Sequence, residues 1–363
     1  MSTSRIQSPD DPALAELCAE LARLAPELDV PGAWPAQQLD LCGQAGVFEW
    51  FVPREAGGQG WSETDVVRGY LALSQACLTT TFVITQRAGA ASRIAVGESE
   101  WAKETLLPDL LAGRTFATVG ISHLTTSRQH LAQPVLRAEE SSGGFLLDGY
   151  SPWVTGGEFA QHVVIGATLP DGRQILIAMP TGLPGVKAPP SPELVALSAS
   201  HTGRVLCERV FVDRQWLLAG PKHDVMKQGL GAKTGGLQTS TLAVGLTRAA
   251  VKFLIDESQR RDDLADPAAA LHSELTYLEH ALLALAGGET CEGWSANDVR
   301  TQANSLVLRA TQSALAAAKG AGFVAGHPVG RWCREALFFL VWSCPQGVLN
   351  ANLCELAGID ADA

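Results

Sequence analysis

The chain has 363 residues, of which 46% are hydrophobic and 18% charged, and its formal net charge at pH 7 is −11. This length and composition predict a globular protein of two or three domains. The 27 lysines and arginines are scattered rather than clustered, which argues against a nucleic-acid partner. Neither an apolar run of membrane-spanning length nor a signal peptide is found, so we expect a cytoplasmic protein without a membrane partner.

The eight cysteines predict no metal site. They lie far apart, without a Cys-x-x-Cys pair and without histidines at the spacing of a zinc site. We expect reduced and mostly buried thiols.

Residues 1–117 are predicted to form a helical domain. Asp11-Pro12 is typical of a helix start, with a capping side chain followed by a first-turn proline. Ser62, with Asp65 three residues later, has the spacing of a capping box. Two further helical stretches follow, to "LLPDLLAGR".

Residues 118–218 are predicted to form a compact antiparallel β domain. Short runs rich in β-forming residues alternate here with turn sequences, of which "SSGG" and "PDGR" are the clearest.

Residues 219–363 return to a helical period and predict a four-helix bundle. Asp266-Pro267 is expected to open the second helix, and Ser295 with Asp298 the third. The last helix is expected to carry "REALFFLVWSCPQ", residues 334–346. The predicted fold class is therefore α+β, with a β domain between two helical domains.

Common nucleotide-binding and hydrolytic motifs are missing. "GLGAKTGG" and "GAGFVAG" each miss the G-x-G-x-x-G spacing, and neither follows a predicted strand. The sequence contains no G-x-x-x-x-G-K-[ST], H-E-x-x-H or G-x-S-x-G. A Rossmann domain, a metalloprotease and a serine hydrolase therefore have no support.

Five segments, in the right order and at the right separations, resemble those of the acyl-CoA dehydrogenase family of flavoproteins. They are "AGVFEWFVPREAGGQGWSETD", "LLPDLLAGRTFAT", "FLLDGYSPWVTGG", "VFVDRQWLLAGP" and "KGAGFVAGHPVGRWCREA". The resemblance implies the same three-domain fold, assembly into a homotetramer or dimer, and FAD held between the β domain and the bundle.

Trp153 and Thr155 match the residues that, in this family, lie against the flavin ring and hydrogen-bond near its N5. An indole shields the ring from solvent, and a hydroxyl donor stabilises electron density that arrives at N5. The alternative is a tryptophan on a buried strand followed by a turn threonine.

The stretch "ISHLTTSR" takes the place of another flavin-contacting loop of the family. Ser122 and Ser127 fall at its hydroxyl positions, whereas His123 replaces its glutamate and Arg128 its aspartate. Hydroxyl and main-chain contacts to the cofactor are still expected here.

Arg261 matches an arginine that, in the family, reaches the FAD pyrophosphate of a neighbouring subunit, a contact that suits a guanidinium. An exposed arginine at a helix end is the alternative, because Leu264 and Ala265 depart from the motif. Gly320 and Gly322 match glycines that let the backbone approach the adenosine part of the cofactor, although Lys319 replaces the first glycine.

The carboxylate base of the family is missing. The resemblance places it at Ser343, and a second location used by some members falls near Gly235 and Gly236. A serine hydroxyl is too weak a base unaided. Trp342 and Cys344 are expected to line the substrate cavity, with a core tryptophan and an inert thiol as the alternatives. Glu335, Glu158 and His123 are the remaining candidate bases.

Three functions follow from this resemblance. The first is an FAD-dependent oxidoreductase acting on an acyl thioester of CoA or of a carrier protein, with an electron-acceptor protein or oxygen as second partner. The second is a flavin monooxygenase or oxidase, and the third a catalytically inactive flavin-binding paralogue.

Overall fold

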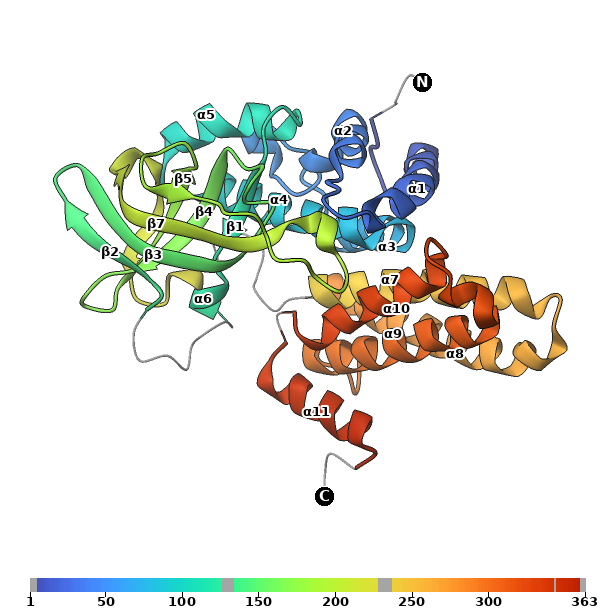
Figure 1. Ribbon diagram of the computed structural model, residues 1–363. Helices are drawn as coiled ribbons and strands as arrows, with labels where there is room; N and C mark the ends of the chain where they lie inside the picture. Colours follow the sequence, from blue (N-terminus) through green and yellow to red (C-terminus); the bar gives the residue numbers. More distant parts are fainter. Residues whose placement is uncertain (1–4, 126–133, 228–236, 343, 360–363) are drawn as a thin grey trace.

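The computed structural model describes residues 5–125, 134–227, 237–342 and 344–359. A β domain lies beside two helical groups, one from each end of the chain (Figure 1). The predicted fold class is confirmed. None of the described helices is long and apolar enough to cross a membrane, and the described side chains form no cluster of three or more potential metal ligands.

The N-terminal helices begin where the sequence predicts. The side chain of Asp11 accepts a hydrogen bond from the backbone of Ala13, and that of Ser62 from the backbone of Asp65. The helices are α1 (Pro12–Leu24), α2 (Ala36–Gln44), α3 (Glu63–Ala76), α4 (Leu78–Val96) and α5 (Glu100–Leu111).

Helix α4 joins two hydrophobic cores. Its first half, with Phe82 and Ile84, packs in the core shared by the N-terminal and C-terminal helices. Its second half, with Ala90 and Ile94, packs against α5 and the sheet. Because α4 is buried on nearly all sides, it fixes the β domain relative to the helices.

The sheet is mixed rather than fully antiparallel, which corrects the prediction. Strand β1 runs parallel to β4, and β2 meets β4 in parallel at one residue pair. A parallel pair needs a long connection, which the chain between these strands provides, so no local turn signal sets the direction of β1. The strands are β1 (Ala117–Gly120), β2 (Leu136–Ser141), β3 (Gly144–Thr155), β4 (His162–Thr168), β5 (Gln174–Pro180), β6 (Val186–Lys187), β7 (Thr202–Asp213) and β8 (Leu217–Lys222).

The remaining strands follow the predicted hairpins. In the described chain the order is β6-β7-β3-β2-β4-β5-β8, with β1 beside β4. The β2–β3 and β4–β5 turns each contain a glycine with positive φ, Gly143 and Gly172, at the predicted turn sequences.

The C-terminal helices are α7 (Gln238–Ser258), α8 (Ala265–Ala286), α9 (Ala296–Ala318), α10 (Pro328–Ala336) and α11 (Gln346–Ala357). The predicted capping box of Ser295 and Asp298 is confirmed. Helix α8 begins one residue before Asp266, which is therefore not its cap. The backbone is already helical before Asp266, because the 3-10 turn Asp262–Leu264 runs directly into α8.

The sequence predicted that one helix carries residues 334–346, and this prediction is wrong. Helix α10 ends at Ala336, a 3-10 turn follows over Leu337–Leu340, and α11 begins at Gln346. Arg300 and Asn304 of α9 donate to the carbonyl of Phe339, which offers that oxygen a partner outside the helix. Pro345 also disfavours a helical residue before it.

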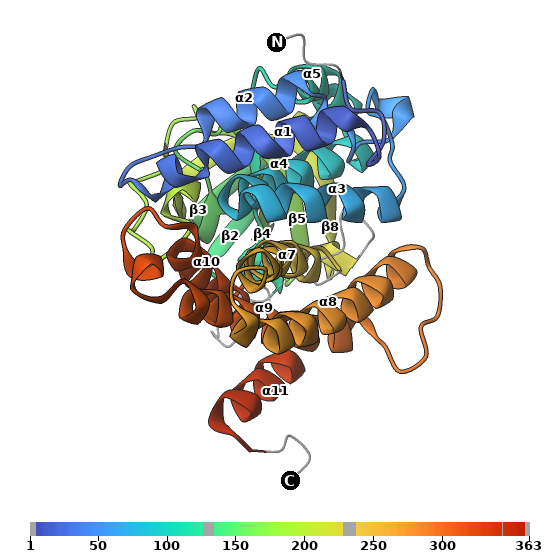
Figure 2. The ribbon, with the colours of Figure 1, turned by 90° about the vertical axis from the view of Figure 1, so that its right-hand side faces the viewer.

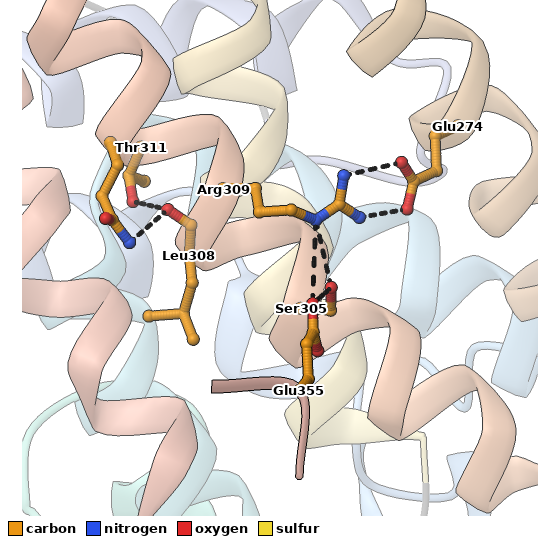
Figure 3. A network of polar contacts seen from close by, with 7 residues as sticks. Glu274, Ser305, Leu308, Arg309, Thr311 and Glu355 are labelled. Atoms are coloured by element: carbon orange, nitrogen blue, oxygen red, sulfur yellow. Dashed lines mark hydrogen bonds and ion pairs between the residues drawn. The ribbon is translucent and has the colours of Figure 1, made fainter. Parts of the chain in front are cut away.

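Helix α11 lies apart from the bundle and contacts α9 (Figure 2). Ser305 of α9 donates to Glu355 of α11 at 2.5 Å, and Arg309 bridges Ser305 to Glu274 of α8 (Figure 3). These polar contacts fasten α11 to the surface of the bundle.

Candidate functional site

A cavity of about 680 Å³ lies where the sheet meets both groups of helices. It is lined by α4, the end of β1, the end of β3, the loop 194–202, the start of α7 and the segment after α10. Pockets that hold cofactors and small ligands commonly measure about 300–1,000 Å³ and are mainly apolar. This cavity is therefore the candidate site.

Five of the residues singled out from the sequence line this cavity: Ser122, Trp153, Thr155, Trp342 and Cys344. They come from the sheet side and from the helix side, more than a hundred residues apart in the chain. Ser127, Arg128, Gly235, Gly236 and Ser343 lie outside the described residues.

The sheet side of the cavity presents hydroxyl groups and one indole. The Oγ1 atoms of Thr155 and Thr202 lie 2.9 Å apart, and Thr202 Oγ1 lies 2.8 Å from Ser200 Oγ. Three hydroxyls share two hydrogen bonds, which leaves one donor for a bound group. The sequence reasoning missed Thr202 and Ser200.

Ser122 and Trp153 add two features that fit a flat polar-edged ligand. The Oγ atom of Ser122 is buried and has no hydrogen-bond partner among the described residues. Such an orphan group is costly unless a ligand satisfies it. Trp153 is 49% exposed although it lines the cavity, so part of its indole is free to cover a ring.

The helix side of the cavity is an aromatic wall. Phe82 meets Phe338 and Trp342 edge-on, with ring centroids 4.9 and 5.0 Å apart, and Phe338 stacks on Trp342. The three rings tie α4 to the segment after α10 and make this wall apolar and rigid.

The charged side chains that line the cavity in the described chain are both cations. Among the described residues that line it there is no carboxylate and no imidazole, whereas Arg93 and Arg334 both reach it. Burial lowers the pKa of Arg93 to about 10, so it stays charged at neutral pH. Arg334 is paired with Asp29 at 2.7 Å.

Arg300 is a buried cation beside Cys344, and the sequence reasoning missed it. Arg300 is 5% exposed, and its Nη2 donates to the carbonyls of Phe339 at 3.1 Å and Trp342 at 2.8 Å. Burial raises the pKa of the Cys344 thiol, and the neighbouring guanidinium offsets part of this rise. The signal was available: Arg300 and Asn304 are polar residues four apart on the buried face of a helix.

Comparison with known proteins agrees with the sequence resemblance. Residues 12–114 match the family model described as the N-terminal domain of acyl-CoA dehydrogenase. The probable acyl-CoA dehydrogenase YngJ of Bacillus subtilis is 25% identical over 256 residues, 68% of this chain and 67% of that protein. The probable acyl-CoA dehydrogenase fadE25 of Mycobacterium leprae is 23% identical over 354 residues, 89% of this chain and 87% of that protein.

The family model and these relatives support membership of the acyl-CoA dehydrogenase family, in agreement with the sequence resemblance. Solved structures share its fold. The glutaryl-coenzyme A dehydrogenase glutaryl-CoA complex has a TM-score of 0.80 at 18% identity, covering 97% of this chain and 96% of that one. The prolyl acyl carrier protein oxidase AnaB has a TM-score of 0.77 at 14% identity, covering 96% and 100%.

The three candidate replacements for the family's base do not line the cavity. His123 Nε2 lies 2.8 Å from the carbonyl of Gly166, and burial lowers the pKa of this imidazole. Glu158 accepts from the backbone of Ser191 and lies 3.2 Å from His201 Nδ1. Both side chains are therefore engaged with the β domain rather than with the cavity.

Glu335 is buried behind the cavity, at the contact of α10 with α4. It accepts from Thr79 Oγ1 at 3.1 Å, and its Oε1 lies 3.9 Å from Nε of Arg331. Burial raises the pKa of its carboxyl to about 7. A carboxyl with this pKa could act as a base, but Glu335 is not among the residues that line the cavity.

Arg261 lies far from the cavity of its own chain. Helix α7 has 21 residues and is therefore about 30 Å long. Its first residue, Gln238, lines the cavity, whereas Arg261 follows its last turn. There Arg261 donates to the carbonyl of Ala317 at 2.7 Å and to Asp263 at 2.9 Å.

The two predicted cofactor glycines, Gly320 and Gly322, do not line the cavity either and differ in their surroundings. A Cβ atom on Gly322 would lie 2.7 Å from the side chain of Val329 and 2.8 Å from that of Ala318, so packing within the chain already explains this glycine. A Cβ on Gly320 would face open space. Only Gly320 offers backbone that a bound group could approach freely.

Proposed function

We propose that this protein is an FAD-dependent oxidoreductase that oxidises an acyl thioester, carried by CoA or by a carrier protein, in the cavity between the sheet and the helices. The observation that carries the proposal is the division of the cavity wall. One side presents Trp153, the Thr155 hydroxyl and the orphan hydroxyl of Ser122, and the other side is an aromatic wall.

The described residues fit the flavin ring of FAD. The Thr155 hydroxyl, which is hydrogen-bonded to Thr202, would donate to the ring edge that receives electrons. The buried hydroxyl of Ser122 would form a hydrogen bond with the polar end of the ring. Trp153 would cover the ring against solvent. Bound FAD would supply the two-electron acceptor, which no side chain can replace.

The substrate class rests on the family. Relatives of this chain are named acyl-CoA dehydrogenases, and neighbours of the same fold bind glutaryl-CoA or oxidise a prolyl carrier protein. An acyl chain suits the wall of Phe82, Phe338 and Trp342. An electron-acceptor protein or oxygen would reoxidise the flavin.

A flavin-dependent oxidase or monooxygenase is the second candidate. It is favoured by the lack of a carboxylate or imidazole among the described cavity residues, together with a serine at position 343, where the sequence resemblance places the family's base. Chemistry between reduced flavin and oxygen needs no α-proton base at that position.

The placement of Arg261 suggests that the protein works as a homo-oligomer, a homotetramer or dimer. Because Arg261 follows the last turn of a helix about 30 Å long whose first residue lines the cavity, we infer that it contacts the cofactor of another copy of the chain. The open surface at Gly320 lies beside the same end of α9 and would be available to that contact. A cytoplasmic location stays a prediction.

Cofactor uptake tests the proposal first. Trp153→Leu should weaken FAD binding, measured by flavin fluorescence, whereas Trp101→Leu should not. Trp101 is a matched control because it is 40% exposed and packs against Trp216 outside the cavity. A wild-type protein that takes up no FAD would refute both candidate functions. Bleaching of the flavin by acyl-CoA without oxygen, against oxygen consumption linked to NAD(P)H, separates the two.

A further inference from the structure

Cys344 is the only cysteine among the described residues that line the cavity. The residue is partly buried, and its thiol is not part of a disulfide. The other described groups there with exchangeable protons are hydroxyls, amides, the indoles of Trp153 and Trp342, and two guanidiniums. None of these forms a conjugate base at moderate pH. Among the described cavity residues, a thiolate at Cys344 is therefore the strongest available proton acceptor.

Arg300 is a buried cation close to Cys344. Its guanidinium is 5% exposed, and its Nε and Nη1 have no hydrogen-bond partner among the described residues. None of the described carboxylates forms an ion pair with it, whereas its charge acts on the Cys344 thiol. A buried cation without an anion favours ionisation of the group beside it.

Arg300 also fixes the position of Cys344. Its Nη2 binds the carbonyls of Phe339 and Trp342, and the second of these lies two residues before the cysteine. Asn304, one turn further along α9, binds the carbonyl of Phe339 as well. The segment is thus anchored to α9 where the thiol meets the cavity.

We propose that Cys344, as a thiolate held beside Arg300, is the catalytic base that takes the α-proton of the acyl thioester. This inference rests on the proposed function. The Cα–H bond breaks and its proton forms an S–H bond on Cys344. The electron pair left on Cα becomes the new C=C bond as hydride leaves Cβ for oxidised flavin. The substrate loses two electrons, the flavin gains them, and the thiol later returns its proton to solvent.

The charges around the thiol give the reaction a defined pH dependence. Arg300 faces it from α9, and the cavity wall adds Arg334 of α10, which is paired with Asp29, and Arg93 of α4. Burial nevertheless raises the pKa of Cys344 above its ordinary value. The thiolate fraction, and with it the rate of flavin reduction, should therefore rise steadily from neutral to alkaline pH.

The test is anaerobic single-turnover reduction of the FAD-loaded protein by acyl-CoA thioesters across pH. Cys344→Ser keeps the shape but should slow reduction about a hundredfold or more, the usual contribution of a general base. Cys344→Asp should recover part of the rate and shift the pH profile to lower pH. Cys354→Ala, on α11 outside the cavity wall, should behave as the wild type. If the flavin of Cys344→Ser is reduced at the wild-type rate and with the wild-type pH profile, Cys344 is not the base. The proposed function would not be affected by this result.

Alkylation of Cys344 by iodoacetamide, followed by peptide mass spectrometry, is independent of substrate. Its pH midpoint should equal that of flavin reduction in the wild type and should move to higher pH in Arg300→Met, which loses the cation. Two different midpoints, or no shift in Arg300→Met, would contradict the proposal. If the wild type holds FAD but no thioester bleaches it, the proposed substrate class is wrong and the base role falls with it.

Discussion

Replacing Glu335 by glutamine changes a buried carboxyl that titrates far from its ordinary range. Glu335 is 2% exposed and is held by Thr79 and by the more distant Arg331. Glutamine keeps the shape and the ability to accept from Thr79 but cannot ionise. The substitution therefore isolates the electrostatic cost of burying this carboxyl.

The electrostatic cost of burying Glu335 can be calculated from the pKa of its carboxyl. Burial raises the pKa of Glu335 from 4.5 to about 7. Below pH 4.5 the carboxyl is protonated in both the folded and the unfolded chain, and the folded state keeps its full stability. As the pH rises through about 7, the folded state loses up to about 3 kcal/mol, at about 1.4 kcal/mol for each pKa unit.

Urea denaturation at a series of pH values measures this loss. Between about pH 5 and pH 8, the unfolding free energy of Glu335→Gln should gain about 2 to 3 kcal/mol relative to the wild type. Glu335→Gln also leaves Arg331 without its acidic neighbour, which lowers the unfolding free energy by a nearly constant amount. The quantity to compare is therefore how the difference in unfolding free energy changes with pH. Glu289→Gln, at an exposed position, should show no such trend. A difference that stays constant with pH would refute the reasoning.

The same variant separates a structural from a catalytic role. Because Glu335 does not line the cavity, Glu335→Gln should still reduce its flavin with an acyl thioester at close to the wild-type rate. Loss of reduction with FAD still bound would make Glu335 the displaced base instead.

Three further predictions concern the cavity and the proposed contact of Arg261 with the cofactor of a second copy of the chain. Thr155→Val should slow flavin reduction about tenfold through loss of a hydrogen bond to the ring, and an unchanged rate in stopped-flow absorbance would remove that role. Ser343→Glu should raise thioester-dependent reduction and move its pH profile to lower pH, since it restores a carboxylate; complete insensitivity would place position 343 away from the substrate. Arg261→Met should weaken FAD affinity about tenfold in the assembled protein, and Arg260→Met, a mostly exposed neighbour, should not; equal affinities in a fluorescence titration would exclude Arg261 from the cofactor site.

The local parts of the fold could be predicted from the sequence. Ser62 and Ser295 cap their helices because the capping side chain and the residue it binds lie three positions apart. The hairpin turns at Gly143 and Gly172 are equally local. The parallel direction of β1 could not be predicted, because it depends on pairing with β4 about forty-five residues later and not on a turn.

The break after α10 shows how tertiary contacts override an apolar pattern. The run Leu337–Trp342 reads as a helix, yet Arg300 and Asn304 bind its carbonyls from α9. In the sequence, only the two polar residues on the buried face of α9 indicated such a contact. The carbonyl groups that they bind could not be identified without the fold. Trp153 and Thr155 were predicted as flavin-side residues from the family resemblance, and both lie at the end of β3, where they line the cavity.

Anaerobic mixing of the FAD-loaded protein with acyl-CoA thioesters of increasing chain length tests the central claim most directly. We predict that at least one of them bleaches the oxidised flavin absorbance in a single turnover, and that the rate increases with pH. A protein that binds FAD but is reduced by none of these thioesters, while consuming oxygen with NAD(P)H, would contradict the account.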